Sequence, residues 1–142
     1  MSYDLMVFAP EAAPHSNSKE FLSWYQAQAK WGEGHSYDDP AVSTPNLRAW
    51  FAEIIQTFPP MNGPFAVDED EVSEEDEALI TDYSVGQQMI YAGFAWSQAD
   101  QAYDETFELA EKHRLGFFDA SSDQGEVWLP DAKGHLRLAY SK

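Results

Sequence analysis

The sequence has no cysteine and no long apolar run. Without cysteine, disulfide bonds, zinc–thiolate sites, iron–sulfur clusters and thiol nucleophiles are all excluded. No segment approaches the roughly 20 apolar residues that a membrane-spanning helix requires. No charged-then-apolar secretory leader precedes the first strand-like segment. These absences predict a cytoplasmic protein that does not enter the membrane.

Basic side chains are also scarce. The chain has 25 acidic and 8 basic residues, a formal net charge of −17 at pH 7. Binding to nucleic acid or to an anionic membrane surface requires stripes of Lys and Arg, so neither is an expected partner. The excess of negative charge favours a basic protein partner, or it serves only to keep the protein soluble.

The residues that are present suffice for one folded domain over residues 1–142. Apolar residues make up 44% of the chain and aromatic residues 15%, which is enough for a core. One stretch is biased: eight of the ten residues from 68 to 77 are Asp or Glu. Because such a block repels itself and follows a Pro/Gly-rich segment, we predict a flexible acidic loop at residues 65–78.

Apolar periodicity and turn signals predict the order of the elements. The predicted strands are residues 5–8, 79–83, 88–96, 117–119, 127–129 and 136–140. The predicted helices are residues 18–31, 45–58 and 98–115. Ser97 and Asp100 resemble a capping box for the last helix, and Gly116 suits the position just after its end. Trp50 and Trp96 are expected in the core.

The order β-α-α-β-β-α-β plus a C-terminal hairpin predicts the α+β class. We expect an antiparallel sheet with helices packed on one face, related to the ferredoxin-like split β-α-β. A free edge of such a sheet could pair with a second copy, so a homo-oligomer remains an open alternative.

Catalytic motifs are absent, with one weak exception. The sequence has no nucleophile elbow and no phosphate-binding glycine loop, and its histidines lack the spacing of a triad or a metal pair. Glu33, His35, Asp38 and Asp39 could together bind a divalent cation or act as acid and base. Alternatively, Asp38 and Asp39 shape a turn by bonding nearby backbone amides. We favour the turn, and predict no catalytic residue, no metal and no cofactor.

The same region is a candidate surface for a protein partner. Trp24, Trp31 and Tyr37 fit the apolar stripe of the core poorly and lie near the acidic group. Exposed aromatic residues can anchor a partner, while carboxylates accelerate association with a basic one. The predicted partner-binding residues are Trp31, Glu33, Tyr37, Asp38 and Asp39, together with Asp68, Glu69, Asp70 and Glu71 of the acidic loop.

Several phrases spread over nearly the whole chain carry a resemblance to known proteins. They are YDLMVF (3–8), YDDP (37–40), LRAWF (47–51), FPPMNGP (58–64), IYAGFAWS (90–97), LAEKHRLGFFD (109–119) and EVWLP (126–130). Together they resemble small acidic bacterial immunity-like proteins of polymorphic or contact-delivered toxin systems. The resemblance implies a non-enzymatic protein that binds and neutralises a cognate toxin, and it implies no particular site residues. The acidic composition favours neutralisation by occlusion of a basic active-site cleft.

Two other functions are kept as alternatives. One is a small metal-dependent enzyme that uses Glu33, His35, Asp38 and Asp39. The other is a ligand-binding ferredoxin-like module with a pocket between sheet and helices.

Overall fold

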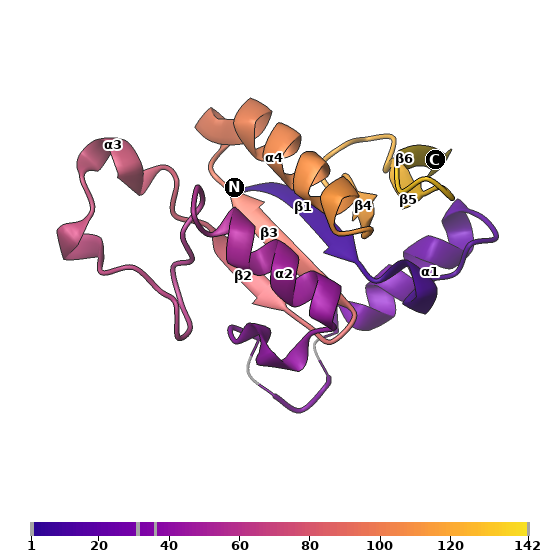
Figure 1. Cartoon of the computed structure of the whole chain (residues 1–142), viewed down its shortest axis with the longest axis horizontal. Coiled ribbons are helices and arrows are strands. Elements are labelled where there is room, and N and C mark those ends of the chain that lie inside the picture. Colours follow the sequence, from indigo (N-terminus) through magenta and orange to yellow (C-terminus); the bar gives the residue numbers. More distant parts are fainter. Residues whose placement is uncertain (1, 31, 36, 142) are drawn as a thin grey trace.

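The computed structural model describes residues 2–30, 32–35 and 37–141, apart from the side chain of Glu69 (Figure 1). Its strands are β1 (Tyr3–Phe8), β2 (Asp82–Val85), β3 (Met89–Phe94), β4 (Gly116–Phe118), β5 (Val127–Pro130) and β6 (Leu136–Tyr140). Its α-helices are α1 (Ser18–Gln28), α2 (Pro45–Ile54), α3 (Glu74–Glu77) and α4 (Ala99–Lys112). None of the described helices combines the length and apolarity needed to cross a lipid bilayer.

All six strands form one antiparallel sheet in the order β2-β3-β1-β4-β5-β6. The unit β1-α2-β2 is split, because β3 lies between its two strands. The unit β3-α4-β4 is split in the same way by β1. This arrangement confirms the α+β class and the ferredoxin-like relation. The predicted C-terminal hairpin forms from β5 and β6. It continues the sheet beyond β4.

The helices cover both faces of the sheet. Leu5 and Val7 of β1 lie in the core under α2 and α4, which pack side by side in Figure 1. Their neighbours Met6 and Phe8 point to the opposite face and pack with Phe21 of α1. The prediction that the helices pack on one face is therefore wrong for α1. A strand buried on both faces explains the unbroken apolar run from residue 5 to residue 8.

The two tryptophans expected in the core have different environments. Trp50 of α2 is fully buried, whereas Trp96 is 52% exposed. Trp96 begins a 3-10 turn (Trp96–Gln98) just beyond the end of β3, where its ring lies 5.0 Å from that of Tyr3. The prediction for Trp96 is wrong because periodicity within a strand does not extend past its end. Trp24 of α1, which was expected at the surface, packs instead against Phe8 and Phe21, because α1 covers the second face of the sheet.

The boundaries of α4 also differ from the sequence prediction. Ser97 lies in the 3-10 turn, and Gln98 precedes the helix without a side-chain cap, so the predicted capping box does not form. After the helix, Arg114 adopts the left-handed conformation, with φ of 57°. Gly116 is not a helix cap but the first residue of β4, opposite Phe8 of β1.

The acidic loop is partly helical. It contains a 3-10 turn (Glu69–Glu71) and α3, whose first amides are capped by the Ser73 side chain, which accepts from Asp76 N at 3.3 Å. No residue of α3 is buried, and Figure 1 shows the segment standing away from the sheet. The loop is exposed, as its charge predicts, but short helical turns organise it.

Candidate partner-binding surface

The loop formed by residues 32–35 and 37–39 is tied to the β2–β3 hairpin. Val85 N donates to the Tyr37 carbonyl at 2.8 Å, and Gln87 N donates to Glu33 Oε1 at 3.0 Å. Within the loop, Glu33 N donates to the Tyr37 hydroxyl oxygen at 2.7 Å. Hydrogen bonds from Glu33 and Tyr37 therefore hold the loop against the last residue of β2 and the turn that follows it.

The candidate acid–base residues in this loop have structural partners. His35 Nε2 lies 2.6 Å from Glu33 Oε1, and the His35 ring lies 4.5 Å from that of Tyr37. Asp39 accepts from Ala41 N at 2.9 Å and caps a 3-10 turn (Pro40–Val42), which confirms the turn interpretation for Asp39. Within the described residues, no three His, Asp or Glu side chains gather as a metal site requires.

Folding brings this loop against the base of the acidic loop. The carbonyl oxygen of Asp38 lies 2.2 Å from where a Cβ at Gly63 would be, so the two backbones are in direct contact. Asp68 Oδ1 accepts from Asp70 N at 3.0 Å, which orders the first acidic turn. The two predicted surfaces thus adjoin. Of their residues, Trp31 and the side chain of Glu69 lie outside what the structure describes.

The negative charge is concentrated in one part of the chain. Residues 49–111 contain fifteen Asp or Glu and no Lys, Arg or His, whereas the remainder holds ten acidic residues and all eight Lys and Arg. This segment forms most of α2, the acidic loop, β2, β3 and α4. Figure 1 shows the acidic loop at one end of the molecule, α1, β5 and β6 at the other, and the remaining elements of this segment between them. Because eight of the fifteen carboxylates belong to the acidic loop, the negative charge is densest at that end.

An open groove lies at the base of the acidic loop. Its lining residues come from the start of β1, the start of β2, the end of β3 and the feet of the loop: Ser2, Met61, Ile80, Asp82, Gly93, Phe94 and Ala95. Met61 N donates to the Thr81 carbonyl at 3.0 Å, which joins the two feet of the loop. Sequence analysis missed this groove, because nothing in the local pattern brings these segments together.

Carboxylates also gather where β1 begins and β4 ends. Tyr91 donates its hydroxyl to Asp4 Oδ2 at 2.5 Å, and Asp4 N donates to Ser121 Oγ at 2.7 Å. Asp119 is only 8% exposed and accepts from Ser122 N at 3.1 Å. Burial raises the pKa of the Asp119 carboxyl, and the nearby carboxylate of Glu126 raises it further.

This buried carboxyl predicts a pH-dependent gain in stability for Asp119→Asn. A pKa raised in the folded state means that stability falls as the pH rises through that pKa. Asn stays neutral and keeps an oxygen acceptor for Ser122 N. We expect the variant to melt a few degrees above the parent at pH 7, with the gap narrowing as the pH approaches 3.8, the ordinary pKa.

Thermal unfolding between pH 4 and pH 8 checks this prediction. Asp123→Asn is the matched control, because Asp123 is exposed in the same loop. A difference in Tm between the Asp119 variant and the parent that stays the same at every pH would contradict it.

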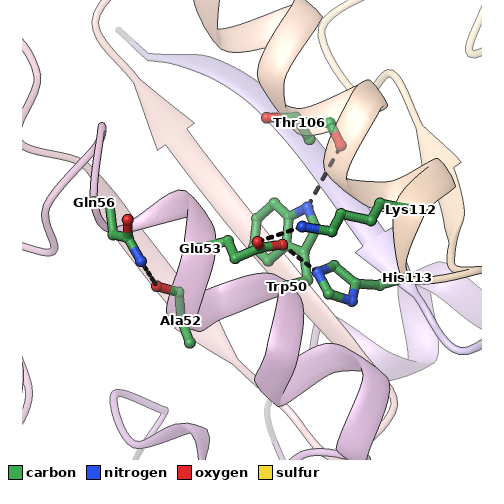
Figure 2. A network of polar contacts seen from close by, with 7 residues as sticks. All are labelled: Trp50, Ala52, Glu53, Gln56, Thr106, Lys112 and His113. Atoms are coloured by element: carbon green, nitrogen blue, oxygen red, sulfur yellow. Dashed lines mark hydrogen bonds and ion pairs between the residues drawn. The ribbon is translucent and has the colours of Figure 1, made fainter.

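A further polar network joins the ends of α2 and α4 (Figure 2). Glu53 Oε1 accepts from Lys112 Nζ at 2.6 Å, and Glu53 Oε2 pairs with His113 Nε2. Hydrogen bonds from Lys112 and His113 lower the pKa of Glu53. Beside this network, Trp50 Nε1 donates to the Thr106 carbonyl at 3.4 Å. Because the Lys112 side chain is 60% exposed and that of Glu53 32%, water screens this ion pair, and the network adds little stability.

No known protein indicates the function of this chain. Its sequence matches no protein-family model and no curated protein, and no solved structure matches it. Its function is therefore inferred from the distribution of charge, the exposed side chains and the contacts described above.

Proposed function

We propose that the protein is a non-enzymatic, cytoplasmic immunity protein that binds a basic bacterial toxin and neutralises it by occluding the toxin's active-site cleft. The observation that carries the proposal is the segregation of charge. A segment of 63 residues holds fifteen acidic and no basic side chains, and eight of those acids lie in the acidic loop, which stands at one end of the molecule. The resemblance to immunity-like proteins supplies the class of partner.

The physical argument concerns how such a partner would be captured. Toxins that act on nucleic acid or nucleotides need basic clefts to hold phosphate groups. An acidic protein whose negative charge is densest at one end attracts such a cleft from a distance and orients it before contact. The Debye length is about 8 Å at physiological salt, so closely clustered carboxylates act together on an approaching cation.

The contact is assigned to the adjoining loops beside β2. Asp68, Asp70 and Glu71 are exposed in the acidic loop and meet the partner first. Residues 33–35 and 37–39 lie behind them, where Tyr37 and Asp38 are half-buried. The carboxylates of Glu33 and Asp39 already accept backbone hydrogen bonds, so their role is to hold the loop in shape.

Co-expression with the product of the neighbouring gene tests this proposal. We expect a salt-sensitive complex that co-purifies and a restored growth rate in cells that carry the toxin. Replacing both Asp70 and Glu71 with Lys should weaken the complex about tenfold or more and abolish rescue, because it reverses two charges where contact begins. The circular dichroism spectrum should not change.

The control variant has the same change in net charge, but its substitutions lie outside the proposed contact surface. Glu11→Lys with Asp123→Lys reverses two exposed charges outside the 49–111 segment and should leave rescue intact. Equal weakening by both pairs would show that total charge, not this surface, drives binding. If the parent protein gives neither a complex nor rescue, the proposal is wrong.

A further inference from the structure

The groove at the base of the acidic loop has a floor without a side chain. Gly93 of β3 lies opposite Asp82 of β2 on one side and opposite Asp4 of β1 on the other. Residues directly opposite each other in a sheet point to the same face. With strands about 4.8 Å apart, the backbones of the two acidic residues flank this floor about 10 Å from each other.

The carboxylate of Asp4 reaches over the edge of the floor. A Cβ placed on Gly93 would lie 3.4 Å from Asp4 Oδ1 and 3.3 Å from Ser2 Oγ. On the side of the acidic loop, Met61 and Ile80 form an apolar wall, and Met61 is 47% exposed. The groove therefore combines an apolar wall with Asp82 on one side of the floor. On the other side, just outside the lining, the Asp4 carboxylate accepts from Ser2 Oγ and from the Tyr91 hydroxyl.

We propose that this groove binds an arginine side chain of a basic protein partner. The aliphatic part of the arginine packs against Met61 and Ile80, and the guanidinium lies over Gly93 between Asp4 and Asp82. For the identity of the partner, this inference rests on the proposed function.

Charge complementarity supports this occupant. The described ion pairs include neither Asp4 nor Asp82, and no basic residue occurs between residues 49 and 111. A cation from outside the chain therefore meets no competing basic side chain from that segment.

Geometry favours arginine over the other cations. A guanidinium with one hydrogen bond on either side spans about 8 Å, which suits two carboxylates on backbones about 10 Å apart. An ammonium group is more compact and spans less. A calcium ion prefers six or more oxygen ligands, whereas the described residues bring no third His, Asp or Glu to this floor.

Titration with a short peptide, followed by amide NMR, tests the site without the toxin. The probe is acetyl-Leu-Arg-Leu-amide, and its control is the same peptide with the neutral isostere citrulline in place of Arg. We expect saturable shifts centred on the amides of Gly93 and Asp82 with the arginine peptide, and none with the citrulline peptide.

Variants of the groove sharpen the test. Gly93→Ala fills the floor and should weaken binding about tenfold or more. Asp82→Asn removes one carboxylate and should weaken it about threefold. Asp104→Asn is the matched control, because it removes one exposed charge on α4 and should leave the affinity unchanged. Thermal unfolding verifies that each variant is folded. If Gly93→Ala does not fold, the affinity of the Asp82→Asn variant tests the site.

Two results would overturn the inference: shifts spread along the acidic loop with none at Gly93, or equal affinity in the Asp82 and Asp104 variants. The outcome is independent of the toxin experiment. If the peptide binds at Gly93 but the protein does not rescue cells from the toxin, the arginine site is supported and the immunity function is wrong. If the protein rescues cells but the peptide does not bind at Gly93, the immunity function is supported and the arginine site is wrong.

Discussion

Gly116→Ala is expected to destabilise the protein by about 3 kcal/mol, because there is no room for a side chain at this position. A Cβ on Gly116 would lie 2.2 Å from Phe8 Cζ and 2.4 Å from Phe8 Cε2. The Phe8 ring cannot move aside, because it is fully buried and packs against Phe21 at 5.1 Å and Trp24 at 5.7 Å between ring centroids.

Urea and thermal unfolding measure this effect. For a chain of this size, a loss of about 3 kcal/mol lowers Tm by about 10 °C. Gly32→Ala is the matched control, since no atom lies within 4 Å of an added Cβ there. We expect that variant to stay within about 0.5 kcal/mol of the parent.

A double variant identifies the cause of the loss. Phe8→Leu removes ring atoms from the space that a Cβ on Gly116 would enter. The two changes together should therefore cost less than the sum of their separate costs. If Gly116→Ala lowers the free energy of unfolding no more than Gly32→Ala does, β1 and β4 do not pack as closely at this position as described.

Trp50→Ala is expected to cost about 4 kcal/mol, whereas Trp96→Ala should cost less than about 1 kcal/mol. Trp50 is fully buried, contacts Tyr83 edge to face and bonds the backbone of α4 at Thr106, so its removal leaves a large cavity. Trp96 is half exposed and contacts the Tyr3 ring.

Urea unfolding monitored by far-UV circular dichroism compares the two variants, and this signal does not depend on the tryptophan that is lost. Trp50→Phe provides an intermediate case, because it restores part of the lost volume. Similar costs for the Trp50 and Trp96 alanine variants would mean that the interface of α2 and α4 is not the centre of the core.

Elements with strong local signals could be predicted from the sequence. The start of α2 follows from proline at the first helical position, after Thr44. The C-terminal hairpin follows from its turn, in which Asp131 Oδ1 accepts from Lys133 N at 2.8 Å and from His135 N at 3.0 Å. In the candidate site, Asp39 caps a turn as an Asp before proline is expected to do.

Features that depend on distant contacts could not be predicted. The position of Gly116 after a helical segment suggests a helix cap. Glycine is required there for a different reason, because Phe8 on the neighbouring strand leaves no room for a side chain. The groove over Gly93 needs three strands in register, and one residue of slip would point its carboxylates to the other face. The concentration of acidic residues between 49 and 111, by contrast, is visible by counting charges in windows along the chain.

The occupied outer edge of β2 limits how copies of this chain can assemble through their sheets. Val85 N donates to Tyr37, and Thr81, just before β2, pairs with Pro60. In the described part of the sheet, β6 forms the other edge. Edge-to-edge pairing of two copies is therefore expected to use β6, about a two-fold axis. Such a pair would present only the partly covered β2 edges, which disfavours strand-by-strand growth into a filament.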